Sequence, residues 1–340
     1  MNDYYSLRQR YGIFLDSIMI SAQLAAAFEV SGWPKPGNVH RTSDFGFTLF
    51  EHFIAGSIAL GPSCREAAFG GLKGKLGIIK LNKIGIGSCI NSAINSINLW
   101  HYGGNTHLGT ILLFMPICAG AGYLGSIGLI EPSSLRSATK LVMENTSTED
   151  SVNTYRAILN SQVNGLGKLK EPEHPDLTSR EATNDLVSNK FTLYDVMMAS
   201  SSRDTISREW ISGMEVTFQL GYTTFKSTYE EFKNVNLSTV HTFLTILSKF
   251  PDTFIARRVG LKKVKFVEDA VKIGMGIAQE ISDRAAQVLK LGGLSTIEGK
   301  KALIQFDADL KLAGSDMNPG TTADLTASSL LVAILCGFRP

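Results

Sequence analysis

The chain has 340 residues, of which 44% are hydrophobic and 19% charged, and its formal net charge is +2. This length allows a large buried core, while the near-neutral charge offers no basic surface and so predicts no nucleic-acid partner. Four scattered cysteines without a CxxC pair, and an N-terminus without a basic region followed by an apolar run, predict a cytoplasmic protein rather than a secreted one.

Helical periodicity recurs along the chain and strand-like alternation is scarce, which predicts an all-α fold. We expect one large helical domain over residues 1–340, because strands alternating with helices are not visible. A break at Phe250-Pro251-Asp252-Thr253 would end one helix, and Asp252 or Thr253 could cap the next. Helices are expected at 10–30, 48–60, 83–100, 132–144, 150–164, 203–232, from about 238, after 253, at 264–291 and at 295–312, with a loop at 70–77.

A stiff loop follows the first predicted helix, where two prolines and two glycines occur between Ser31 and Val39. Glu29 precedes this loop. A rigid loop with many polar groups suits substrate contact, and a solvated turn is the alternative interpretation. Its polar residues are Lys35, Asn38, His40, Arg41 and Asp44.

A stripe of three asparagines marks the helix predicted at 83–100, because Asn91, Asn95 and Asn98 fall on one face. Asparagine is a poor helix former that prefers caps and turns. The stripe carries no charges, so it predicts a polar wall beside a cavity rather than a face exposed to solvent.

The motif GGNTHLG follows this stripe at Gly103–Gly109. Its glycines would let the backbone approach a ligand closely. Asn105 or Thr106 could cap the next helix, which would leave free N–H groups for an anion, and His107 lies beside them. An ordinary connection between two helices is the alternative.

No charged residue occurs from Leu108 to Ile130, a length that could span a bilayer. Five glycines and Pro116 interrupt the segment, and small residues favour close contact between helices. We therefore predict a central apolar helix buried by its neighbours, which disfavours a membrane protein.

Two polar stretches complete the pattern. The hydrophilic section 165–190 predicts a surface loop or lid, in which His174 would be solvated. Near the other end, NPGTTADL carries Thr321, Thr322 and Asp324 onto the start of an apolar helix. Either threonine is a natural N-cap, and an aspartate there favours the helix dipole even without a catalytic role.

Several familiar catalytic motifs are missing: the GxxxxGK[ST] phosphate loop, HExxH, GxSxG and any zinc spacing of Cys and His. What remains is a set of Asn, Asp and Thr residues on loops at helix ends. Such residues suit a hard cation such as Mg²⁺ together with phosphate oxygens.

Taken together, EVSGWPKPGNV (Glu29–Val39), GGNTHLG and NPGTTADL resemble the triphosphoribosyl-dephospho-CoA synthase family, also called ATP:dephospho-CoA triphosphoribosyltransferase. Asp252-Thr253 before an arginine pair is a weaker family feature. The resemblance covers most of the chain. It implies an all-helical enzyme in which the 2′-hydroxyl of dephospho-CoA attacks the ribose C1 of ATP, adenine leaves and the triphosphate stays attached.

The resemblance also suggests roles for individual residues. Glu29, Asp44 and Asp324 are candidates for the base, and Asp44 and Asp324 for ligands of Mg²⁺. The remaining candidates would bind substrate or phosphate: Lys35, Asn38, His40, Arg41, Asn105, Thr106, His107, Thr321 and Thr322.

One departure bears on these roles, because the family usually has lysine after the histidine of its NTH motif, where this chain has Leu108. A divergent branch acting on another nucleotide-like substrate is therefore one alternative, as a Mg²⁺-dependent transferase or hydrolase. A non-catalytic membrane or scaffold protein is the alternative from another class. The oligomeric state stays open, a homo-oligomer included.

Overall fold

The structure, a computed structural model, describes residues 7–44, 47–125, 129–163, 166–170, 174–179 and 181–340. Within these ranges all regular structure is helical, and strand-like pairing is limited to two isolated bridges. The all-α prediction is therefore confirmed. The helices are α2 (Gly12–Ser31), α3 (Phe50–Ala59), α4 (Gly61–Lys75), α5 (Ile86–Trp100), α6 (Leu108–Leu124), α7 (Pro132–Glu144), α8 (Thr148–Asn160), α9 (Ala182–Ser188), α10 (Leu193–Ser200), α11 (Thr205–Ser212), α12 (Tyr222–Phe232), α13 (Val235–Lys249), α14 (Thr253–Leu261), α15 (Val267–Lys290), α16 (Ile297–Ala313) and α17 (Gly320–Leu335), with short turns η1 (Leu81–Lys83), η2 (Val216–Gly221), η3 (Gly293–Ser295) and η4 (Ser315–Met317).

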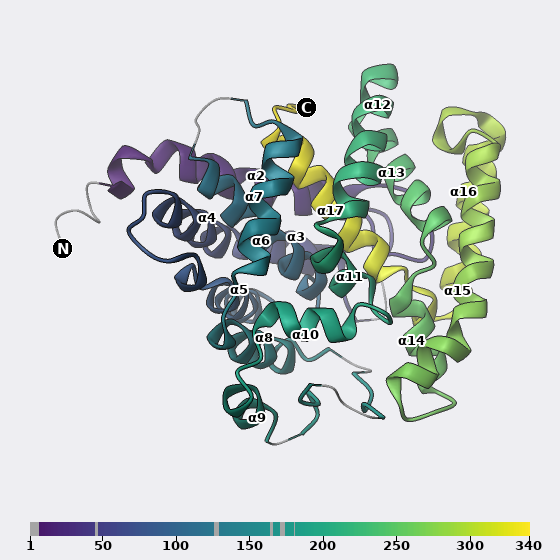
Figure 1. Cartoon of the computed structure of the whole chain (residues 1–340). Coiled ribbons are helices and arrows are strands. Elements are labelled where there is room, and N and C mark those ends of the chain that lie inside the picture. The colour runs from purple at the N-terminus through teal and green to yellow at the C-terminus, as the bar shows by residue number, and fades with distance from the viewer. Residues whose placement is uncertain (1–6, 45–46, 126–128, 164–165, 171–173, 180) are drawn as a thin grey trace.

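The predicted central apolar helix is α6, which lies among α4, α5 and α7 (Figure 1). Every residue from Thr110 to Gly122 is buried. Its glycines allow this packing, since a Cβ at Gly122 would lie 1.9 Å from the carbonyl oxygen of Ala68 in α4. The apolar segment is therefore a core helix covered by its neighbouring helices, as predicted. Residues 126–128 of the predicted segment lie outside the described residues.

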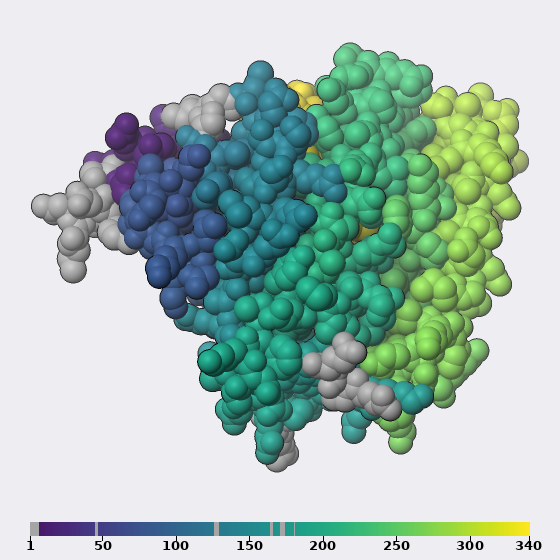
Figure 2. All heavy atoms as spheres, in the orientation of Figure 1, coloured from purple at the N-terminus to yellow at the C-terminus, as the bar shows by residue number. Residues whose placement is uncertain are grey.

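A second apolar helix, α17, is also central, and surrounding helices cover nearly all of it in the view of Figure 2. It contacts α2, α6, α13 and η2. Hydroxyl groups on its buried face bond to neighbouring elements, as Ser328 does with Thr217 of η2 at 2.8 Å. Together α6 and α17 form the middle of the larger hydrophobic core.

A smaller core lies among α13, α14, α15 and α16 at one side of the molecule (Figure 1). The side chain of Asp252 joins this group to α17. Its Oδ1 accepts hydrogen bonds from the backbone N–H groups of Phe254 and Ile255, and its Oδ2 accepts from both the N–H and the hydroxyl of Thr322. Asp252 therefore caps α14, as predicted, and also satisfies the start of α17.

The structure departs from the predicted elements in several places. Residues 70–75 belong to α4 rather than to a loop, because Gly70 and Gly71 pack closely against Ile84 and α6. The stretch predicted as one helix at 203–232 is α11, η2 and α12, separated after Ser212 by Gly213 at φ +65°. Another helix, α10, lies where none was predicted.

The hydrophilic section 165–190 contains a helix, α9, that the prediction of a loop did not include. His174 is buried rather than solvated, with its Nε2 3.2 Å from Nη2 of Arg203. Some of this section lies outside the described residues. In the described part of the chain one helix, α2, is long and apolar enough to cross a membrane, and half of that stretch is buried inside the protein.

Candidate active site

A cavity of about 270 Å³ lies where α2, α6, α8, α10, α14 and α17 meet, with residues from the 166–177 segment completing its wall. The three sequence motifs are far apart in the chain, yet residues from all three line this space. The predicted site residues found there are Glu29, Asn38, Asn105, Thr106, His107, Thr321 and Asp324.

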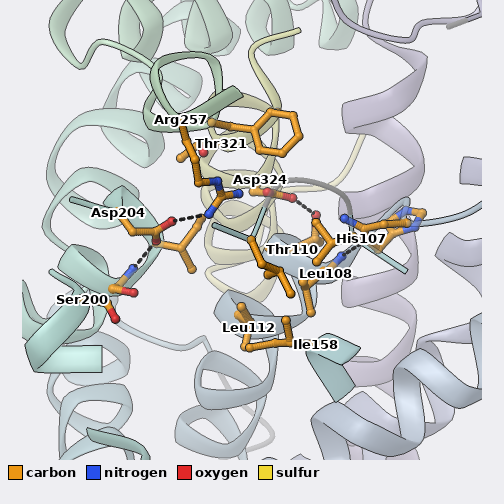
Figure 3. Close-up of a pocket in the computed structure, with 18 of the residues that line it drawn as sticks. His107, Leu108, Thr110, Leu112, Ile158, Ser200, Asp204, Arg257, Thr321 and Asp324 are labelled. Carbon is orange, nitrogen blue, oxygen red and sulfur yellow. Dashed lines mark hydrogen bonds and ion pairs between the residues drawn. The ribbon is translucent and has the colours of Figure 1, made fainter. Parts of the chain in front are cut away.

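Asp324 is the carboxylic acid of the third motif, and it faces the cavity from the N-terminal part of α17, just after the first turn (Figure 3). The Thr110 hydroxyl donates a hydrogen bond to its Oδ1 over 2.6 Å. Its Oδ2 lies so close to Gly109 that a Cβ there would be 2.0 Å away. Burial, followed by the negative charges of Glu29 and Asp252, raises the pKa of Asp324 to about 8.

Glu29 forms a buried ion pair with Lys35, whose Nζ also donates to Oδ1 of Asn38 over 3.1 Å. Asn38 in turn donates to Oδ1 of Asn318 over 2.8 Å. Burial raises the pKa of Glu29 and lowers that of Lys35, and the opposite charge of each partner counteracts the shift. Lys35 is fully buried and does not line the cavity, so its ammonium group is not open to a phosphate bound there.

The N-cap residue of α6 is His107 rather than the predicted Asn105 or Thr106. Asn105 lies just before it, and its Oδ1 accepts a hydrogen bond from the backbone N–H of Leu108 over 3.1 Å. Thr106 and His107 continue the cavity wall, with His107 Nδ1 2.8 Å from Thr106 Oγ1. Burial, with a smaller contribution from His101, lowers the pKa of His107 to about 3, so its imidazole is neutral at pH 7.

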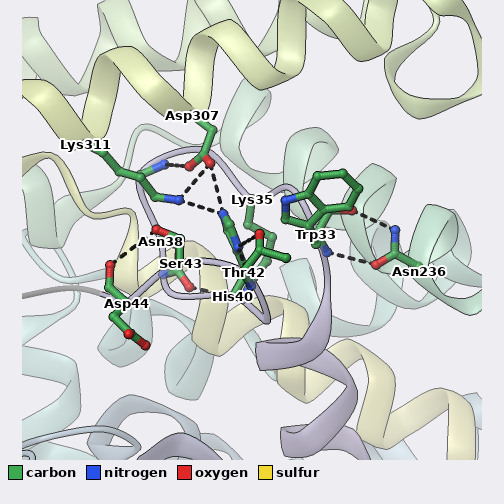
Figure 4. A network of polar contacts seen from close by, with 11 residues as sticks. Trp33, Lys35, Asn38, His40, Thr42, Ser43, Asp44, Asn236, Asp307 and Lys311 are labelled. Carbon is green, nitrogen blue, oxygen red and sulfur yellow. Dashed lines mark hydrogen bonds and ion pairs between the residues drawn. The ribbon is translucent and has the colours of Figure 1, made fainter. Parts of the chain in front are cut away.

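Besides Lys35, four predicted site residues do not line the cavity: His40, Arg41, Asp44 and Thr322. His40 is buried, with its Nε2 2.9 Å from Asp307 Oδ2 and 2.7 Å from Lys311 Nζ, and so fixes the loop to α16 (Figure 4). Arg41 donates to the carbonyl of Ser31, and Thr322 bonds Asp252. Asp44 is exposed and accepts from the backbone N–H of Phe50 at the start of α3.

The asparagine stripe also lies elsewhere than predicted. Asn98 donates to the carbonyl of Asn160, and Asn95 accepts from the side chain of that residue. Asn160 ends α8, so the stripe joins α5 to α8 instead of forming a wall of the cavity. The sequence showed that one face was polar but not which neighbour it meets.

Two arginines line the cavity that were not among the predicted site residues, Arg203 and Arg257. Arg203 bonds Ser200 and His174. Arg257 Nη1 lies 3.7 Å from Asp204 Oδ2, while its buried Nε has no hydrogen-bond partner in the described part of the chain. The arginine pair after Asp252 was the sequence signal that could have identified Arg257.

An apolar part of the wall extends from Leu108 and Leu112 of α6 to Tyr155 and Ile158 of α8 and Met197 of α10. In Figure 3, Leu112 and Ile158 lie on one side of the space, opposite Arg257 and Asp324. Such a cavity suits a ligand with a flat or aliphatic portion joined to a strongly polar one.

The donors expected for Mg²⁺ fit in a limited way. Among the described residues no cluster of three or more His, Cys, Asp and Glu side chains forms a metal site. Mg²⁺ commonly binds one or two carboxylates together with substrate phosphates. Asp324 and Glu29 both line the cavity, whereas Asp44, the other predicted ligand, does not.

Comparison with known proteins adds two findings. The sequence profile of a family described as ATP:dephospho-CoA triphosphoribosyl transferase matches residues 15–339. A crystal structure from Archaeoglobus fulgidus, described provisionally as a triphosphoribosyl-dephospho-CoA synthase, has 23% sequence identity and a TM-score of 0.53, covering 80% of this chain and 99% of that chain. At this identity the similarity shows a shared fold. No match is found among curated proteins.

Proposed function

Because the chain belongs to the ATP:dephospho-CoA triphosphoribosyl transferase family, we propose that its cavity transfers the 5-triphosphoribosyl group of ATP to the 2′-hydroxyl of dephospho-CoA. The hydroxyl oxygen forms a bond to C1′ of the ATP ribose, and the bond from C1′ to N9 of adenine breaks. The electron pair of that bond leaves with adenine, which takes up the proton that the hydroxyl loses.

The observation that carries this proposal is the position of Asp324. This carboxyl group is fixed at the junction of α6 and α17 by Thr110, and it faces the cavity. A positioned carboxylate can take the proton of an attacking hydroxyl and stabilise the positive charge that develops on the sugar. We assign Asp324 as the base, since Glu29 is paired with Lys35. The pKa of Asp324 is raised to about 8, so the carboxyl must lose its proton before it can act, and turnover should increase as pH rises towards 8.

We assign Arg257 to the triphosphate, with Arg203 beside it. Arg257 lines the cavity, its Nε lacks a partner and its ion pair with Asp204 is long. A guanidinium group is suited to phosphate because it presents several N–H donors in one plane. These arginines offer cations in a cavity where Leu108 stands in place of the lysine usual in the family.

A Mg²⁺ ion bound with the triphosphate would neutralise part of its charge. Most of its ligands would be phosphate oxygens, with Asp324 or Glu29 as the nearby protein carboxylate. The protein's own contribution is then to orient the ribose with Asn38 and Asn105 and to keep the reacting atoms away from bulk water.

The test is to incubate the protein with ATP, Mg²⁺ and dephospho-CoA and to detect adenine and the triphosphoribosyl adduct by mass spectrometry. We expect both products from the wild type and neither from Asp324→Asn, with an unchanged circular dichroism spectrum. Asp316→Asn is the matched control, because Asp316 precedes the same helix but pairs with Arg258 and Lys262. Adenine without the adduct would mean that another acceptor is used, and wild-type turnover by Asp324→Asn would exclude Asp324 as the base.

A further inference from the structure

A chain of hydrogen bonds begins at the backbone of Gly103 and ends at His107 in the cavity wall. The backbone N–H of Gly103 lies 3.1 Å from Nδ1 of His101, and Nε2 of His101 lies 3.1 Å from Oγ1 of Thr106. The same Oγ1 lies 2.8 Å from Nδ1 of His107. Three residues of one loop are thus linked in series.

The direction of this chain follows from its first member. A backbone N–H can only donate, so Nδ1 of His101 must accept and carries no proton. A neutral imidazole with an unprotonated Nδ1 has its proton on Nε2, which donates to Oγ1 of Thr106. The threonine hydroxyl has then accepted one bond and donates its own proton to Nδ1 of His107.

These hydrogen-bond directions hold when both imidazoles are neutral. Burial lowers the pKa of both His101 and His107, with His52, stacked 5.2 Å from His101, lowering the pKa of His101 further. A protonated His101 would also place an Nδ1 proton against the N–H of Gly103. Charge and geometry therefore favour the same state.

His107 is one of the residues that line the cavity. Its Nδ1 and Cε1 lie against α3, where a Cβ at Gly56 would be 2.6 Å and 2.7 Å from these atoms. The ring also packs against Phe53 at 5.3 Å between centroids. Nε2 has no protein partner in the described part of the chain, although His107 lines the cavity.

We propose that the relay through His101 and Thr106 fixes His107 as its Nε2–H tautomer, so that His107 donates a hydrogen bond to an acceptor atom of the bound nucleotide. His107 then serves as a neutral donor and not as a base. His101 and Thr106 are positioning residues. The assignment of a nucleotide as the ligand rests on the proposed function, whereas the tautomer does not.

Nuclear magnetic resonance of the substrate-free protein with ¹⁵N-labelled histidine tests the tautomer directly. The His107 signal, identified by its absence in His107→Gln, should show a protonated Nε2 and an unprotonated Nδ1 and should not titrate between pH 6 and 8. Thr106→Val should disturb this pattern and Thr106→Ser should restore it. A protonated Nδ1, or titration near the usual histidine value, would overturn the proposal.

Binding and activity test the donor role. His107→Gln keeps an N–H donor near the position of Nε2, whereas His107→Ala removes it. We expect the alanine variant to lose about tenfold in affinity or turnover and the glutamine variant to lose less, as for one hydrogen bond between uncharged groups. Equal losses in both variants would contradict the donor role.

Two separate probes, adenine and inorganic triphosphate, identify the acceptor. If His107→Ala raises the dissociation constant for adenine alone, a purine nitrogen accepts from Nε2. If it raises the constant for triphosphate alone, a phosphate oxygen does so. Unchanged affinity for both would overturn the donor role. A failed transferase assay with the expected tautomer would instead count against the proposed function.

Discussion

Asp324 lies directly against a glycine, and this contact restricts what can replace either residue. Gly109→Ala would place a methyl group within about 2.0 Å of Oδ2, so α6 and α17 would have to move apart. We expect this variant to lose transferase activity and to unfold at lower denaturant. Gly276→Ala is the control, because a Cβ at Gly276 in α15 meets nothing within 4 Å. The control should be neutral or stabilise by about 0.5–1 kcal/mol.

The raised pKa of Asp324 also predicts how stability depends on pH. The folded protein keeps this proton up to about pH 8, while an unfolded aspartate releases it near its usual pKa of 3.8. The folded state therefore binds more protons in this window, and its stability falls as pH rises, by roughly 1.4 kcal/mol per pH unit at most.

Asp324→Asn cannot ionise, so the free energy of unfolding should fall less steeply with pH than in the wild type. Urea unfolding in metal-free buffer between pH 5 and 8 measures the difference. Asp309→Asn is the comparison, because Arg284 lowers the pKa of Asp309 and that carboxylate is already ionised in this range. Identical pH slopes in wild type and Asp324→Asn would show that the Asp324 carboxyl is not held protonated.

Adjacent arginines offer another test with its own control. Arg257→Gln should weaken binding of inorganic triphosphate by about 10- to 100-fold, the usual effect of losing hydrogen bonds from a charged group. Arg258 pairs with Asp316 and does not line the cavity, so Arg258→Gln should bind normally. Isothermal titration calorimetry of the wild type and the two variants measures these affinities. Equal weakening in both variants would contradict the assignment of Arg257 to the triphosphate.

At the scale of the helix, Asp252 is the residue on which two elements depend. It accepts bonds from the first turn of α14 and from Thr322 of α17, and it is buried. Asp252→Ala should therefore lower the free energy of unfolding by about 2–4 kcal/mol, because several buried donors lose their acceptor.

Asn234→Ala is the comparison for that experiment. Asn234 caps α13 with one bond to the N–H of Leu237 and is exposed. We expect it to cost about 1 kcal/mol, the usual value for an N-cap. Similar losses in the two variants, measured by urea unfolding, would mean that Asp252 acts as an ordinary cap and does not couple α14 to α17.

The sequence predicted where the helices lie better than it predicted which elements pack against one another. The helix at 132–144 was predicted with its observed bounds because Pro132 begins it and its apolar positions repeat regularly. Residues 70–75 were mistaken for a loop because glycine normally weakens a helix, and the close contact with α6 that compensates is a tertiary effect. Asp252 at the N-terminus of α17 could not be predicted, since it lies 70 residues from Thr322.

The same holds for the site residues: their positions along the helices were predictable, but their bonding partners were not. Motif residues at the ends of α2, α6 and α17 meet at the cavity. Lys35 and His40 are polar residues of the first loop, but each bonds a buried partner inside the protein. Lys35 pairs with Glu29, and His40 contacts Asp307. Periodicity and motif spacing indicate where helices and their polar ends lie. They do not indicate which polar groups form hydrogen bonds or ion pairs with one another.

For the whole molecule, substrate should act as a stabilising ligand. A nucleotide at 100 times its dissociation constant should raise the free energy of unfolding by about 2.7 kcal/mol. If the predicted lid at 165–190 closes over substrate, hydrogen exchange at 166–170 and 174–179 should slow when ATP and Mg²⁺ are added. Residues 297–313 of α16 lie outside the predicted lid, do not line the cavity and serve as the internal reference. Equal exchange with and without ligand would leave the segment a surface loop.

The burial of α17 has a consequence for a nascent chain on the ribosome. Residues that line the cavity extend from Ala26 to Ala327, and α17 is made after every other element of the wall. While α13 to α16 are synthesised, the surface of α6 and α2 that α17 covers in the folded protein therefore lacks its partner. A nucleotide that binds beside Asp324 can stabilise the fold only after α17 has been made.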